Sequence, residues 1–289
     1  MNTKITLLIF LFVSYLSINA QNNQPDINTN YEKPRSAFIG LSTGISSSNL
    51  RDFASSPLIY KGHPLYFAGS FMRVNENRET EIRISTLFGN YNISVGHENT
   101  SSKVNVYNFY YSRLYKFNKL GNDKWHIKIG GLYQLTYDYR INEALQNLSH
   151  GSEFFSNVMA SAKFEFDASR KTNKEKNFLF IKYKTEPRKR NLSFRLNIGL
   201  INSTYRNAYA YLGQSGILNE FKLFDNYEFK LFSGIRMSTE LNYTIYLKNK
   251  NAIQLSYIWD AYKTGGDNDK YEMAHHIFRL TFLFNANNK

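Results

Sequence analysis

The sequence predicts an all-β fold, in which antiparallel strands close into a single transmembrane β-barrel of about twelve strands, within a range of roughly 10–14. Three observations lead to this prediction. Long runs of residues alternate between apolar and polar side chains. After the N-terminus, no segment approaches the ~18 consecutive apolar residues of a membrane helix. Finally, 22 Tyr and 23 Phe among 289 residues are typical of the aromatic girdles of membrane barrels.

The clearest alternation lies near the C-terminus, in residues 229–247, 253–260 and 276–284. In each run every second residue is mostly large and apolar, and the residues between are mostly small or polar. A period of two places the two sets on opposite faces of a strand. One tight turn and one longer loop join the runs, so they indicate an antiparallel meander with lipid on one face and water on the other. A half-buried sheet gives the same pattern, so a soluble secreted β protein is the architectural alternative.

Residues 1–20 have the pattern of a cleaved signal peptide: Lys4, an apolar stretch over residues 5–13, and the small residue Ala20. We expect cleavage after Ala20, a flexible periplasmic tail over residues 21–35, which contain two prolines, and a barrel over residues 36–289. The sequence contains no cysteine, which excludes disulfides and lipid attachment through an N-terminal cysteine.

The formal net charge is +13. Such an excess is found in proteins that bind nucleic acid or anionic lipid headgroups, and in anion-selective pores. The predicted signal peptide makes nucleic acid the least favoured of these, and we predict no nucleic-acid partner. Much of the basic excess lies in predicted turns, residues 170–176 and 188–190, where solvation explains it. The mean hydropathy of −0.47 argues against a helical membrane protein but is compatible with a barrel.

In chain order, residues 37–48 form a weak, Gly/Ser-rich first strand. Residues 50–64 interrupt the alternation and contain two prolines, which predicts a surface loop or a segment folded into the lumen rather than a central strand. A hairpin over residues 65–74 and 79–88 and a longer loop over 91–102 follow. Further strands are expected over the following ranges: 103–117, 125–140, 154–168, 178–184 and 192–200. Residues 141–152 are predicted to be a polar loop with helical character, and residues 201–224 have the least legible pattern.

The chain resembles the outer-membrane β-barrel proteins of Gram-negative bacteria in residues 18–21 (Ile-Asn-Ala-Gln), 192–200, 253–262 and 277–284. The last of these is similar to the aromatic closing strand that the barrel-assembly machinery recognises, although residues 285–289 continue beyond it. The resemblance implies a location in the cell outer membrane, contact with its lipids, and the assembly machinery as a partner during biogenesis. It assigns no activity, because a fold does not determine a function.

The polar faces of the predicted strands supply the candidate functional residues, which we expect to line the lumen: Arg83, Lys128, Asp138, Arg140, Arg195, Arg236, Glu240, Asp260 and Arg279. Rings of Arg or Lys favour anions, so one interpretation is a charged constriction that selects anionic solutes. The alternative is a network of salt bridges that fills a narrow barrel and conducts nothing. A barrel of about twelve strands lies between filled barrels and open porins, so its size does not decide.

Three functions are therefore considered. The leading hypothesis is a passive channel or transport protein for small solutes, anionic ones included, with a net basic lumen. The second is a non-conducting structural or accessory barrel that docks a partner protein through its loops or lumen. The weakest is a lipid-modifying enzyme, because His97 and Ser101 are four residues apart in a predicted loop and a nucleophile needs its base within hydrogen-bonding reach.

No metal site or cofactor is predicted. His275 and His276 are adjacent, so on a strand they point to opposite faces and cannot hold one ion together. Asp267 and Asp269 offer oxygen ligands, but the surrounding sequence lacks the rest of a calcium loop. We therefore interpret these residues as an interfacial histidine pair and a polar turn.

Overall fold

The protein is described from a computed structural model. The structure describes residues 35–95, 98–121, 124–148, 150–169, 174–178, 181–185, 187–207, 227–266 and 269–287. The predicted signal peptide, the tail up to residue 34 and His97 lie outside these residues.

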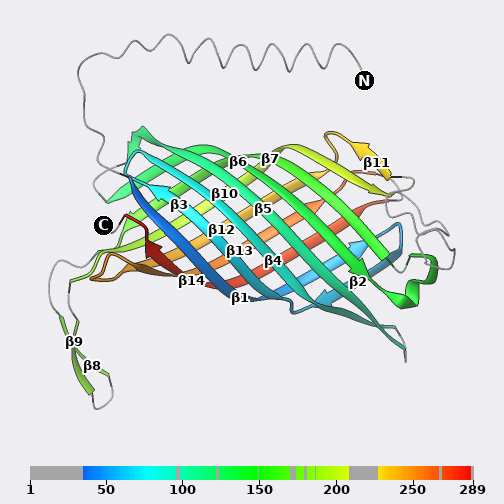
Figure 1. Ribbon diagram of the computed structural model, residues 1–289, viewed down its shortest axis with the longest axis horizontal. Coiled ribbons are helices and arrows are strands. Elements are labelled where there is room, and N and C mark those ends of the chain that lie inside the picture. Colours follow the sequence, from blue (N-terminus) through cyan, green and yellow to red (C-terminus); the bar gives the residue numbers. More distant parts are fainter. Residues whose placement is uncertain are drawn as a thin grey trace, which may run out of the picture. The chain divides into compact units, whose positions relative to one another are not determined.

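Among the described residues, the main sheet has twelve strands. Ten of them, all except β2 and β11, form a closed antiparallel ring in which each strand pairs with two neighbours (Figure 1). In ring order these ten are β1 (Ser36–Asp52), β3 (Leu65–Val74), β4 (Arg78–Val95), β5 (Glu98–Gly121), β6 (Trp125–Ile141), β7 (His150–Asp167), β10 (Arg190–Asn207), β12 (Ile235–Tyr246), β13 (Ala252–Lys263) and β14 (Tyr271–Asn285). β14 pairs with β1 and closes the ring. The predicted all-β antiparallel barrel of about twelve strands is confirmed.

The remaining elements are short. β2 (Ser56–Gly62) and β11 (Tyr227–Lys230) join the ring sheet, whereas β8 (Lys174–Phe178) and β9 (Ile181–Thr185) pair only with each other. A 3₁₀ helix, η1 (Glu143–Leu148), lies in the predicted polar loop with helical character. In the part of the chain that the structure describes, no helix is long and apolar enough to cross a membrane. We call the end where β1 begins and β14 ends the terminal rim, and the other end the loop rim.

Three predicted boundaries are wrong. The run over residues 229–247 is two strands, β11 and β12, because the chain turns between them with positive φ at Phe232 (56°) and Gly234 (80°). The predicted loop over residues 91–102 is instead the extended end of β4 and the start of β5, which pair up to Val95 and Glu98. The predicted strand over residues 178–184 belongs to the β8–β9 hairpin and not to the ring. The C-terminal meander β12–β13–β14 is confirmed.

Residues 56–64 lie in the middle of the sheet, which corrects the prediction of a loop or lumen segment. β2 and β3 pair with β1 in one continuous register, from Ser48 opposite Gly62 to Ile45 opposite Leu65, so they are one strand interrupted at Pro64. The Pro64 carbonyl still accepts a hydrogen bond from the Ser46 amide at 3.0 Å. Opposite on β4 is Gly89, where a Cβ would lie only 2.8 Å from the Pro64 Cα. A central strand accommodates this proline because its neighbour has no side chain.

Replacing Gly89 by Val is therefore expected to destabilise the barrel by about 1–3 kcal/mol, the usual cost of forcing extra atoms into a packed site. The midpoint of urea unfolding in detergent, followed by heat-modifiable electrophoretic mobility, measures this effect. Gly69→Val is the matched control, since a Cβ at Gly69 meets nothing within 4 Å. Equal midpoints for the two variants would contradict the close approach of Pro64 and Gly89.

The outer face of the ring is apolar. Side chains such as Ile45, Leu200 and Phe278, exposed by 64%, 62% and 58%, point outward from strands whose inward residues are buried. Towards the loop rim, aromatic rings follow one another across neighbouring strands, with Tyr137 4.5 Å from Phe154 between ring centroids. Towards the terminal rim, Trp125 packs on Phe166. So large an exposed apolar surface needs a non-aqueous surrounding, and the rings form the two aromatic girdles of a membrane barrel.

Candidate functional site

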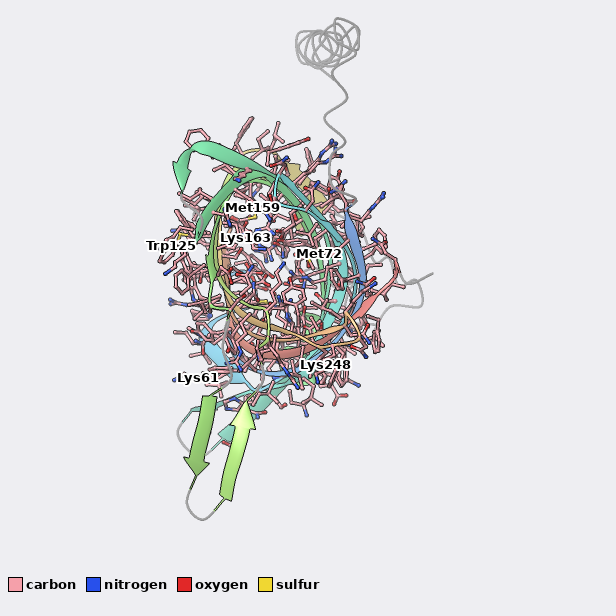
Figure 2. All side chains as sticks on the ribbon, turned by 90° about the vertical axis from the view of Figure 1, so that its left-hand side faces the viewer. Lys61, Met72, Trp125, Met159, Lys163 and Lys248 are labelled. Atoms are coloured by element: carbon pink, nitrogen blue, oxygen red, sulfur yellow. The ribbon has the colours of Figure 1, made fainter. Side chains whose placement is uncertain are left out.

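The structure places all nine sequence-predicted candidates inside the barrel, with their side chains buried: Arg83, Lys128, Asp138, Arg140, Arg195, Arg236, Glu240, Asp260 and Arg279. Alternation along each strand positions them, because their strand neighbours face outward. Viewed along the barrel, side chains such as Lys163 and Met159 fill the interior, whereas Trp125 lies on the outer side (Figure 2). The nine residues do not form one ring but belong to successive layers along the barrel.

The layer nearest the terminal rim is a closed square of alternating charges from β4, β6 and β7. Lys128 Nζ lies 3.2 Å from Glu79 Oε2 and 2.9 Å from Glu165 Oε2. Lys163 Nζ lies 2.8 Å from Glu79 and 2.9 Å from Glu165. Each charge therefore has two partners of opposite sign, which is how buried charges are compensated.

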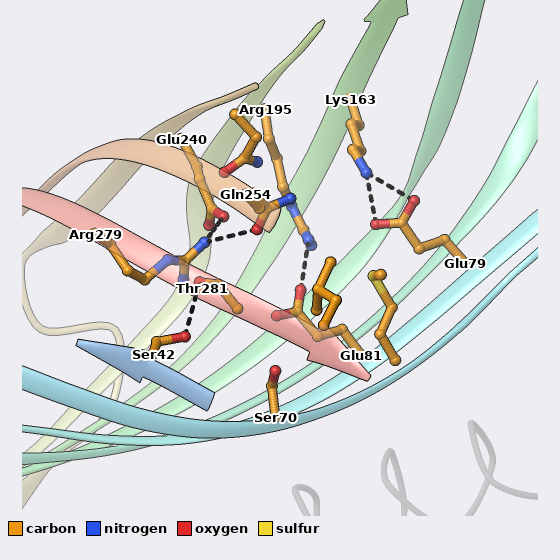
Figure 3. A pocket seen from close by; sticks show the side chains of 13 residues that line it. Ser42, Ser70, Glu79, Glu81, Lys163, Arg195, Glu240, Gln254, Arg279 and Thr281 are labelled. Atoms are coloured by element: carbon orange, nitrogen blue, oxygen red, sulfur yellow. Dashed lines mark hydrogen bonds and ion pairs between the residues drawn. The ribbon is translucent and has the colours of Figure 1, made fainter. Parts of the chain in front are cut away.

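The next layer is centred on Glu240 of β12 (Figure 3). Its carboxylate accepts hydrogen bonds from Arg279 Nη2 at 2.5 Å and from Arg83 Nη2 at 3.1 Å. Arg83 also contacts Glu81 at 2.7 Å, and Arg195 Nη1 lies 3.8 Å from the same Glu81. The cavity left between these side chains has a volume of about 30 Å³, enough for roughly two water molecules.

Arg236, at the start of β12, is the hub of the third layer. Its guanidinium donates two hydrogen bonds to Asp260, at 2.6 and 3.1 Å, and one each to Thr136 at 2.8 Å and Asn157 at 3.0 Å. Its Cζ also lies 4.7 Å from the ring centroid of Tyr262. Beside this layer is a second cavity of about 50 Å³, lined by both polar and apolar side chains. These contacts satisfy the arginine on every side and leave it no freedom to contact a passing solute.

Towards the loop rim the interior is closed by charge and by aromatic packing. The Asp52 carboxylate forms ion pairs with Arg140 Nη2 and Arg206 Nη2, each at 2.7 Å. Asp138 accepts hydrogen bonds from the Tyr262 and Tyr271 hydroxyls. The following buried apolar residues pack around them: Leu50, Tyr60, Tyr66, Leu87, Tyr91, Val104, Val106, Phe155, Ile258, Met273 and Ile277.

Together these layers contain eight carboxylates and eight cations. The carboxylates are Asp52, Glu79, Glu81, Asp138, Glu153, Glu165, Glu240 and Asp260, and the cations are Arg83, Lys128, Arg140, Lys163, Arg195, Arg206, Arg236 and Arg279. The described interior is therefore balanced in charge. Among the described residues the interior thus shows no net basic charge, in contrast to the expectation, because several carboxylates on the inward faces were not identified from the sequence.

Seven of these charges were missed, and for most a signal existed. Glu79 and Glu81 have the same parity along β4 as Arg83, and Lys163 and Glu165 alternate with Phe164 on β7. The alternation of inward and outward residues along each strand would by itself have identified these four residues as candidates. Glu153 follows the same rule on β7. Asp52 and Arg206 lie in the stretches that gave no clear alternation, so no sequence signal indicated them.

The two histidines lie on opposite faces, as predicted. His275 Nδ1 is 2.7 Å from Ser48 Oγ inside the barrel, whereas His276 Nδ1 is 2.7 Å from the Tyr257 hydroxyl outside it. Both Ser48 and His275 are buried, and the 50 Å³ cavity that His275 borders has no room for a lipid ester. Within the described ranges, no group of three or more His, Cys, Asp or Glu is placed to hold a metal ion.

At the loop rim, Asp269 of the predicted polar turn forms an ion pair with Lys230 of β11, 2.7 Å from Oδ2 to Nζ. This hydrogen bond raises the pKa of Lys230. Arg206 Nη1 also donates to the Asp269 carbonyl at 2.5 Å. The pair ties the β13–β14 connection to β11. Asp267 lies outside the described residues.

No protein-family model matches the chain, and a search of curated proteins found no significant match. Several solved structures match over most of their length. Neisserial surface protein A (NspA) is 9% identical with a TM-score of 0.34, covering 86% of this chain and 97% of that chain. The translocator domain of the autotransporter NalP from Neisseria meningitidis is 8% identical, with a TM-score of 0.35 and 96% of each chain covered. The toluene transporter TodX of P. putida is 7% identical, with a TM-score of 0.31 and 92% of each chain covered.

The chain has the architecture of an outer-membrane β-barrel. This statement depends on the closed ring, the apolar outer face and the polar interior. The three similar structures are named for different roles, so the likeness assigns none of those roles to this chain.

Proposed function

We propose that this chain is a non-conducting accessory barrel of the outer membrane, which meets a partner protein at its loop rim rather than passing solutes through its lumen. One observation carries the proposal: the described interior is filled by charge-balanced, mutually paired side chains that leave cavities of only about 30 and 50 Å³. A pore requires a continuous wet path wider than the ion it conducts.

Energetics support a closed interior. An ion entering the Glu240 layer would have to separate Glu240 from Arg83 and Arg279, whose side chains are at least 90% buried. Breaking a buried ion pair by removing one partner typically costs about 3–5 kcal/mol, and the layers towards both rims would impose further costs. The same contacts make the barrel a rigid scaffold.

The loop rim offers a surface for a partner. On the outer face of β4 and β5 the large apolar residues end at Phe88 and Tyr107, and the exposed residues beyond them are polar: Asn90, Asn92, Ser94, Asn99, Ser101 and Lys103. At 3.3 Å per residue, the six residues that follow Phe88, up to Ser94, extend the hairpin by about 20 Å beyond the apolar band. Because bacterial barrels have short periplasmic turns and longer outer loops, we assign this rim to the cell exterior.

A passive channel is the second candidate, favoured by one observation. The two interior cavities both border Glu240, so movement of this side chain together with Arg83 would join them. A solute in the wider, 50 Å³ cavity would then still have to pass the aromatic side chains packed around Tyr262 to reach the loop rim. An anion-selective path of this kind remains the function to be tested against the closed barrel.

We expect the purified, refolded protein to give no conductance steps in a planar lipid bilayer, because the paired charges seal its interior. Heat-modifiable mobility shows that the preparation is folded. Replacing Arg83, Glu240 and Arg279 together by Ser empties only the second charged layer, so this variant should also be silent, because the layers towards both rims still close the interior. Discrete steps with anion preference from the unaltered chain, measured in a salt gradient, would overturn the closed-barrel proposal in favour of the channel.

A further inference from the structure

A groove of about 420 Å³ lies on the outer surface of the barrel near the loop rim, over β12, β13, β14 and β1. Its lowest part is made by Ala261 and Ala274, which are directly paired across β13 and β14. Larger side chains surround these alanines, with Met237 beside Ala261 on β12 and Trp259 two residues away on β13. Two small residues side by side thus leave a hollow in a wall that is otherwise bulky and apolar.

Irregular pairing of β2 completes one wall. The register between β1 and β2 shifts between Leu50 and Asp52, which places extra residues in β2. As a result, both Leu58 and Ile59 are exposed, instead of one pointing inward, and Ile59 borders the groove. A bulge of this kind redirects a side chain, and here it adds an apolar wall on the outside of the barrel.

The end of the groove nearest the loop rim is charged. Arg51, Glu272 and Lys263 form one cross-strand row over β1, β14 and β13. Glu272 is paired with Lys263 at 2.8 Å. The Arg51 Nε donates to the Pro57 carbonyl at 2.8 Å, and its Cζ lies 4.1 Å from the Phe53 ring centroid. These contacts fix the guanidinium in place and leave its terminal nitrogens able to donate to a ligand.

The groove therefore runs from the aromatic girdle to the charged rim. On the outer face of β13, Trp259 is the next outward residue after Tyr257, which belongs to the apolar outer face of the barrel. Lys263 and Arg51 lie closer to the loop rim, beyond these apolar residues. A membrane barrel presents this level of its surface to lipid headgroups. An occupant needs an apolar tail to cover the alanines and an anionic group to reach Arg51.

We propose that this groove binds one acyl chain of an anionic phospholipid, whose phosphate has no cationic headgroup beside it to neutralise it and is held by Arg51. The chemistry fits a lipid on three counts: the hollow is lined mainly by apolar side chains, it opens towards the hydrocarbon, and its polar end has a fixed cation. The site is on the outer wall, so it does not depend on whether the lumen conducts.

Trp259 allows a direct test, because the chain has only two tryptophans. In the Trp125→Phe variant, Trp259 is the only tryptophan and reports contact with brominated acyl chains, which quench its fluorescence. The protein is reconstituted in vesicles that mix phosphatidylcholine with phosphatidylglycerol, with one or the other brominated. A Lys or Arg near anionic lipid is worth ~1 kcal/mol, so the anionic phosphatidylglycerol should be preferred over the zwitterionic phosphatidylcholine at Trp259 by about fivefold.

Matched variants separate the two parts of the site. Arg51→Gln should abolish the preference, whereas Lys103→Gln, which removes one exposed charge elsewhere on the outer face, should preserve it. Ala274→Leu fills the hollow and should also abolish the preference, whereas Ala160→Leu on the outer face of β7 should not. The Trp259→Phe variant, which reports from Trp125 near the terminal rim, should show no headgroup preference.

Equal quenching by both brominated lipids at Trp259 would overturn the proposal. A preference that survives both Arg51→Gln and Ala274→Leu would overturn it too, since the contact would then lie elsewhere. Inorganic phosphate, added at constant ionic strength, is expected to leave the preference unchanged. If phosphate alone removes it, Arg51 binds a free anion and the groove is not a lipid site.

Discussion

Replacing Glu240 by Gln is expected to lower the free energy of unfolding by about 3–5 kcal/mol, the cost of removing one partner from a buried ion pair. Glu240 compensates two guanidinium groups at once, those of Arg83 and Arg279. An amide has one acceptor oxygen in place of the two carboxylate oxygens that these arginines use, and it supplies no charge. Arg83 would then keep Glu81 as a partner at 2.7 Å, whereas Arg279 would lose the carboxylate with which it is paired.

The measurement is urea unfolding from detergent or lipid, with heat-modifiable mobility and tryptophan fluorescence as two independent signals. Glu228→Gln is the control, because its side chain is 63% exposed and 3.7 Å from Lys230, and surface pairs contribute only about 0–1 kcal/mol. Combining Glu240→Gln with Arg279→Gln should recover part of the loss, since the double variant removes one of the unpaired cations. A single variant as stable as the unaltered chain would contradict the buried network.

The sequence was sufficient for the faces of the strands. In β13 and β14 the outward residues must suit lipid and the inward residues must suit a polar interior, so a period of two records both environments. All nine candidates taken from this parity lie inside the barrel. Parity also explains Ile258, which breaks the polar pattern of β13 and packs in the apolar cluster of the interior.

Which residues the inward side chains contact across the barrel could not be predicted in the same way. Arg83 and Glu240 are 157 residues apart, and alternation states which side of a sheet a residue faces but not which strand lies across the barrel. The balance of charge was missed for this reason. Pro64 illustrates a second limit of prediction from sequence. A central strand tolerates this proline because Gly89 lies opposite it on another strand, whereas the rule about proline considers only the strand that contains it.

The pairing of β1 with β14, which closes the ring, depends on Gly44. A Cβ at Gly44 would lie 2.3 Å from the backbone oxygen of Phe278 and 3.2 Å from the Cα of Arg279, its partner across the two strands. Backbone atoms of a paired strand cannot move aside without breaking hydrogen bonds of the pair. Gly44→Ala is therefore expected to destabilise the barrel by roughly 3 kcal/mol or more, at the upper end for overpacking.

The matched comparison is Gly40→Ala, four residues earlier on the same strand. There the nearest atom to a Cβ is the Ser70 Oγ at 2.3 Å, a hydroxyl that can rotate away, so the loss should be well under that of Gly44→Ala. Refolding into lipid vesicles, scored as the fraction of heat-modifiable and protease-resistant protein, compares the two variants directly. Because both add one methyl group to β1, a difference between them isolates the backbone contact that closes the ring. Equal yields would mean that β1 and β14 are less tightly apposed than this contact requires.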